Sequence, residues 1–66
     1  MSRHGGDSYY VLVNNSGDVY EQEDNLGFTY VVDFDDEDEA QNMLEEFIET
    51  EELDPAEGWH VERHRW

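Results

Sequence analysis

Two histidines near the end of the chain are the first residues whose type and spacing suggest metal chemistry. His60 and His64 are four residues apart, and on a helix this spacing places two imidazoles where they can share one ion. The alternating residues around them indicate a strand instead, in which four residues span about 13 Å. One ion cannot bridge that distance, so we expect surface histidines and no metal site.

The acidic run at residues 33–39 has some of the carboxylates of a calcium-binding loop. A loop of the EF-hand type that started at Asp33 would place Asp38 where glycine must make the sharp turn. It would also place Leu44 where the bidentate glutamate belongs. We therefore interpret the run as a helix cap and a solvated acidic surface, with only diffuse hydrated cations around it.

Residues for covalent or phosphate chemistry are sparse. The chain has no cysteine, which excludes disulfides, thiol catalysis and thiolate metal sites. Ser2, Ser8 and Ser16 fall in polar or turn segments without evident histidine and acid partners. No glycine-rich loop could cradle a phosphate. We predict a protein that has no catalytic activity and needs no cofactor.

The last residues of the chain are the best candidates for binding a partner. This segment holds two of the three arginines, together with two histidines and a terminal tryptophan. Tryptophan and arginine are enriched at the energetic centres of interfaces. We predict a partner-binding strand that meets the acidic helix or a sheet edge of a second copy, or binds another protein. Its residues are His60, His64, Arg63, Arg65 and Trp66.

The elements that would position these residues follow from hydrophobic periodicity. Residues 1–8 are predicted to be a flexible N-terminal arm, and residues 9–66 a single domain. Turn residues at 14–18 separate two strands and predict a hairpin, and the next strand places Phe28, Tyr30, Val32 and Phe34 on one face. The predicted strands span residues 9–13, 19–22, 28–34 and 59–66.

One amphipathic helix is predicted between the last two strands. Apolar residues from Ala40 to Ile48 recur at three- and four-residue offsets. Asp36 and Glu39 are predicted to form a capping pair, and Asp54 before Pro55 should end the helix. The predicted outward acidic face consists of Asp38, Glu45, Glu46, Glu49 and Glu52.

These elements predict an α+β fold in the order β-β-β-α-β, with a mostly antiparallel sheet of about four strands and the helix on one face. A right-handed crossover through the helix would set the last strand parallel to the third and beside the first. The predicted core consists of Val11, Val13, Tyr30, Val32, Phe34, Met43, Leu44, Phe47, Ile48, Trp59 and Val61.

Charge composition is the strongest signal of environment. The chain has 19 acidic residues, three arginines and no lysine, for a net charge of −16. A compact chain with this charge repels itself unless salt or a basic partner screens it. Acidic excess with lysine depletion resembles the composition of cytosolic proteins from salt-accumulating archaea. A hydrophobic content of 36% nevertheless favours a folded chain over a disordered acidic tail.

Two functions remain open from the sequence. The favoured hypothesis is a small salt-adapted interaction module or accessory subunit, acting as a homodimer or with another protein. The alternative is an inhibitor that imitates nucleic acid, because residues 33–57 contain thirteen acids and no base. Direct nucleic-acid binding is disfavoured by the scarcity of cations. With no apolar leader or membrane-length segment, we expect a soluble cytoplasmic protein.

Overall fold

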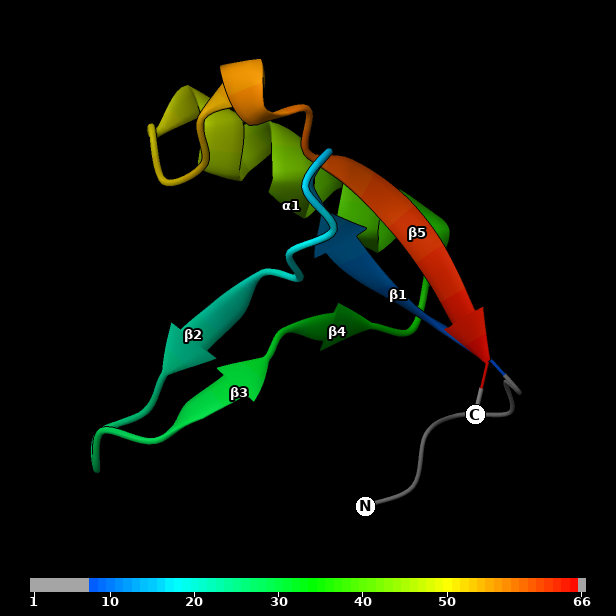
Figure 1. Cartoon of the computed structure of the whole chain (residues 1–66). Helices are drawn as coiled ribbons and strands as arrows, with labels where there is room; N and C mark the ends of the chain where they lie inside the picture. Colours follow the sequence, from blue (N-terminus) through cyan, green and yellow to red (C-terminus); the bar gives the residue numbers. More distant parts are fainter. Residues whose placement is uncertain (1–7, 66) are drawn as a thin grey trace.

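The computed structural model describes residues 8–65, which form five strands, one α-helix and one 3-10 turn (Figure 1). The fold is α+β, as predicted. The first seven residues of the predicted arm (residues 1–8) and the terminal Trp66 lie outside the described residues, whereas Ser8, also predicted to belong to that arm, begins β1. The elements are β1 (Ser8–Val13), β2 (Glu21–Glu23), β3 (Thr29–Val31), β4 (Asp33–Phe34), α1 (Glu37–Glu49), η1 (Pro55–Glu57) and β5 (His60–Arg65).

The main sheet has three strands in the order β4-β1-β5. β1 is central and antiparallel to both neighbours, so β4 and β5 run parallel to each other on either side of it. The predicted direction of the last strand and its place beside the first are therefore confirmed. A run of apolar and aromatic residues from Tyr9 to Val13 suits this central position, where both faces of the strand are covered.

The prediction of one continuous strand at residues 28–34 is wrong. β3 pairs only with β2, in a separate two-stranded sheet, whereas β4 pairs with β1. The predicted strand at 19–22 has different bounds in the structure. Val19 makes only an isolated bridge, and β2 begins at Glu21. Tyr20 lies where the chain passes from the main sheet to the two-stranded sheet. Its N–H donates to the Leu12 carbonyl at 2.8 Å, and its own carbonyl accepts from the Val32 N–H at 3.2 Å.

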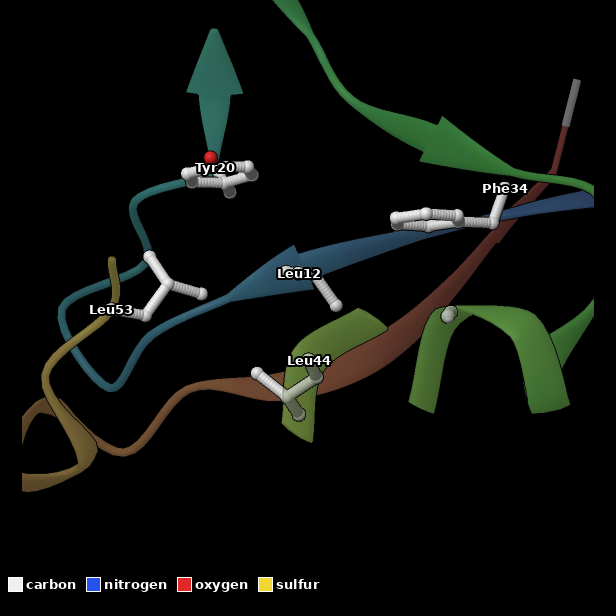
Figure 2. Packing of buried hydrophobic residues seen from close by; sticks show 6 residues of the cluster. Leu12, Tyr20, Phe34, Leu44 and Leu53 are labelled. Atoms are coloured by element: carbon white, nitrogen blue, oxygen red, sulfur yellow. The ribbon is translucent and has the colours of Figure 1, made fainter. Parts of the chain in front are cut away.

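α1 packs on one face of the main sheet and encloses the core with it (Figure 2). Among the predicted core residues, Phe34 and Leu44 are buried in this cluster. Tyr30 was predicted to join them but is 49% exposed, because it lies on β3, away from the helix. The buried cluster consists of Leu12, Tyr20, Phe34, Ala40, Leu44 and Leu53. Half-buried Tyr10, Val32, Met43, Phe47, Ile48, Trp59 and Val61 surround it.

The opposite face of β1 has its own buried apolar residues. Val11 is 1% exposed and Val13 is also buried, although neither belongs to the cluster beneath α1. Successive side chains of a strand point to opposite faces, so these two valines lie on the far face from Leu12. Both were correctly predicted to be buried, and the sheet therefore has apolar packing on each side.

The ends of α1 follow from its capping residues. Asp36 is the N-cap and accepts from the Asp38 N–H at 3.2 Å. Three acidic residues in the first turn suit the positive end of the helix dipole. The helix ends at Glu49, with Thr50 as its C-cap, so the expected end at Asp54 before Pro55 is wrong. Asp54 instead caps η1 by accepting from the Ala56 N–H at 2.9 Å.

Candidate interaction surfaces

The outer edge of β5 is the first candidate surface. Among the described strands, β5 pairs only with β1, so its six residues present an open edge that can accept another strand. The register places Arg63 opposite Tyr10 and Leu12 opposite Val61. Because residues opposite each other share a face, Val61, Arg63 and Arg65 lie on the side covered by α1.

The arginines of this strand are exposed and have no acidic partner within the described part of the chain. Neither Arg63 nor Arg65 forms an ion pair there. In a chain with 19 acidic residues, cations placed only to balance charge would be expected beside carboxylates. The two guanidinium groups are instead available to a group outside this part of the molecule.

The two histidines of β5 lie on the other face of the strand. His64 Nε2 donates to Glu62 Oε1 at 2.6 Å, and its ring contacts Tyr9 edge-on at 5.6 Å between centroids. His60 Nδ1 donates to the Gly58 carbonyl at 2.9 Å. The predicted partner-binding residues therefore share one strand but divide between its two faces, and Trp66 lies outside the described residues.

The acidic face predicted for the helix is only partly helical. Four of its five carboxylates project from α1 and are exposed, and these are Asp38, Glu45, Glu46 and Glu49. Glu52 belongs to the segment after the helix, where its Oε2 accepts from the Tyr20 hydroxyl at 3.0 Å. Glu52 was therefore wrongly placed on the helical face, since the chain leaves the helix at Thr50.

A second surface was missed by sequence reasoning. β2, β3 and the turn between them form an arm, residues 21–31, that extends away from the main sheet (Figure 1). The large exposed apolar side chains of the described chain gather on it: Leu26 is 81% exposed, Phe28 68%, Tyr30 49% and Val31 43%. The signal was present in β2, whose sequence Glu21–Gln22–Glu23 offers no apolar side chain to cover β3.

Hydrogen bonds hold this arm in a defined shape. At the tip, Asp24 Oδ1 accepts from the Leu26 N–H at 2.9 Å and from the Phe28 N–H at 3.0 Å. A carboxylate that accepts from two nearby backbone donors stabilises a tight turn. The apolar side chains at the tip are therefore presented by an ordered turn.

A chain of side-chain hydrogen bonds joins the arm to the segment after α1. The Tyr30 hydroxyl donates to Gln22 Oε1 at 3.3 Å, and Gln22 Nε2 donates to the Tyr20 hydroxyl at 2.9 Å. Tyr20 in turn donates to Glu52. Burial is the largest cause of a raised pKa for Tyr20, and its bond to Glu52 acts in the same direction. The phenol therefore stays protonated and keeps its role as a donor.

Two shallow pockets lie near these surfaces. One of about 240 Å³ lies on the far side of the main sheet, over Val11 and beside His64. Another of about 570 Å³ lies at the end of α1, where Glu49, Glu51 and Asp54 surround Ile48 and Leu53. Within residues 8–65, no three histidine or acidic side chains are arranged to hold a metal ion.

Comparisons with known proteins do not assign the chain to a family. No protein-family model, curated protein or solved structure matches it. No helix in the described part of the chain is both long and apolar enough to cross a bilayer. The chemistry of the two surfaces described above is therefore what indicates the function of the chain.

Proposed function

We propose that this protein is a small, salt-adapted interaction module, an accessory subunit without catalytic activity of its own. The observation that carries the proposal is the gathering of exposed Leu26, Phe28, Tyr30 and Val31 on one projecting arm. Large apolar side chains that are exposed on one element are typical of a binding site. The ordered tip and the anchoring hydrogen bonds support binding by a preformed surface, which costs little entropy on association.

Salt adaptation is supported by the placement of the charges. The carboxylates of α1 are exposed and lie at neighbouring helical positions, where like charges repel unless they are screened. A partner or concentrated salt would both relieve this repulsion. The absence of lysine from the chain favours salt, since a binding partner for one face gives no reason to remove lysine from the others.

Imitation of nucleic acid remains the second candidate, favoured by the exposed row of carboxylates on α1. An imitator should fold in dilute buffer and bind a basic protein there, because charge attraction is strongest at low salt. A salt-adapted module should fold and bind its partner at high salt. The apolar arm favours the module, because apolar contact does not require low ionic strength.

The experiment compares tagged wild type with Phe28→Ser and with the control Asn25→Ser, which alters a polar residue of the same turn. All three are used to capture partners from the source cells in multimolar KCl. Phe28 is largely exposed, so its variant should keep the wild-type circular dichroism. We expect a protein that is retained by wild type and by Asn25→Ser and lost with Phe28→Ser. Identical capture by all three would contradict the proposal.

A further inference from the structure

We infer that two copies of this chain associate through the open edges of β5, antiparallel about a two-fold axis at Val61, to form one continuous six-stranded sheet. The inference rests on the proposed function and names a partner for the β5 surface. β5 suits this role because it is six residues long, whereas β4 at the other edge of the sheet has two. A longer open edge offers more backbone donors and acceptors to an added strand.

Two-fold symmetry limits the possible registers. In an antiparallel pair, residues directly opposite each other share a face of the sheet. Each residue of one copy therefore opposes the residue equally far beyond the axis in the other copy. The axis must pass through one residue of β5, which then opposes itself, and each choice of residue gives a different set of side-chain pairs.

Charge selects among these choices. An axis at Glu62 places that carboxylate against its own copy, and an axis at Arg63 does the same with the guanidinium. Like charges directly opposite each other destabilise a strand pair. An axis at His64 sets Arg63 against Arg65 of the second copy. An axis at His60 or earlier shortens the overlap to three residues or fewer, because Gly58 has φ +75° and ends the extended backbone. An axis at Val61 pairs residues 59–63 of the two copies, sets no like charges opposite each other and places an apolar residue on the axis.

The pairs on either side of a Val61 axis are complementary. On the far face, His60 of each copy opposes Glu62 of the other. On the face covered by α1, Arg63 opposes Trp59 of the second copy, a pair suited to a cation–π contact. Arg65 extends further toward η1 of the second copy, where Asp54 and Glu57 lie. Each guanidinium thus gains a partner that it lacks within residues 8–65.

This arrangement also suits the size and charge of the chain. A domain of 66 residues buries a smaller fraction of its surface than larger domains do, and association is a common way to gain stability at that size. Two copies that each carry −16 repel at low ionic strength. The dimer should therefore form at multimolar salt, where charges more than about 3 Å apart are screened.

Single cysteines test the register, because the chain has none of its own. A residue on the axis faces its copy at a Cα separation of about 4.5–5.5 Å, within the range of a disulfide. In Val61→Cys, mild oxidation at multimolar KCl should therefore give a covalent dimer. Glu62→Cys and Arg63→Cys would be displaced by about 7 and 13 Å along the strand and should remain monomeric on the same timescale.

Arg63→Gln provides a second measurement that needs no cross-link. Sedimentation equilibrium at multimolar KCl should show a wild-type dimer whose dissociation constant rises about tenfold in this variant, equivalent to about 1.4 kcal/mol. Phe28→Ser should leave it unchanged. Faster cross-linking at position 62 or 63 would overturn the register, and a monomeric wild type at high micromolar concentration would overturn the dimer. Neither result would affect Phe28-dependent capture, on which the proposed function is judged.

Discussion

Leu12→Ala is the substitution that should weaken the fold most clearly. Leu12 is 0% exposed and lies at the centre of the cluster formed by Tyr20, Phe34, Ala40 and Leu44. The change removes three carbon atoms, and each buried methylene-sized group contributes about 0.8 kcal/mol. The transfer term is therefore about 2.4 kcal/mol, and a partly collapsed cavity raises the expected loss to about 3–4 kcal/mol.

Urea unfolding at multimolar KCl, followed by circular dichroism, measures this loss. A chain of 66 residues has a total stability of about 3–10 kcal/mol, so the variant should unfold at a much lower urea concentration with a similar slope. Val31→Ala, on the exposed arm, is the control and should cost less than about 0.5 kcal/mol. Equal midpoints for Leu12→Ala and wild type would refute the packing of β1 beneath α1.

The remaining predictions concern Tyr20, whose hydrogen bonds join the arm at residues 21–31 to the segment after α1, and Gly58. Tyr20→Phe removes the hydroxyl that joins Gln22 to Glu52, so stability should fall by about 1 kcal/mol and amide exchange in the arm should accelerate. The folded-state pKa of Tyr20 is raised above 10.0. Wild-type stability should therefore fall as the pH rises beyond about 10, because only the unfolded state then loses this proton readily. The same fall in Tyr20→Phe would show that another group is responsible. Gly58→Ala would place a Cβ 2.2 Å from Asn15 Nδ2, at a residue with φ +75°. Thermal melting should therefore show that the free energy of unfolding falls by at least about 1 kcal/mol. An unchanged melting temperature would contradict the tight turn at this position.

Local patterns predicted much of the fold because their causes are local. The turn after β1 was expected from its asparagines and glycine, and Asn14 Oδ1 accepts from the Ser16 and Asp18 N–H groups there. Asp36 caps the helix as expected. The direction of β5 followed from the crossover through α1. In each of these cases neighbouring residues, or one connection, decide the outcome.

Errors arose where a distant partner decides the outcome. The alternation from Phe28 to Phe34 favoured one strand, but the strand that each half pairs with depends on β1 and β2. The continuous apolar run of β1 hid which side faces α1, so Leu12 was missed while Val11 and Val13 were identified. Leu53 lies beyond the helical pattern and is buried by the return of the chain after α1.

The candidate surfaces, like the fold, were predicted only where the cause is local. Composition and residue type identified the arginines of β5, whereas only the register shows that Arg63 and His64 lie on opposite faces. The exposed arm could not be predicted from β3 alone. Its apolar residues are exposed because β2 and β3 pair with each other in a separate sheet that α1 does not cover, which is a property of the assembled fold and not of either segment.

The dependence of folding on salt tests the central claim of a salt-adapted module most directly. Glutamates one helical turn apart are separated by about 6 Å, inside the Debye length of about 10 Å at 0.1 M and outside that of about 3 Å at 1 M. Wild type should therefore gain stability steeply from dilute buffer to multimolar KCl. A double variant with Glu45→Gln and Glu49→Gln should show a smaller gain. A melting temperature that is unchanged over this range in wild type would contradict the account.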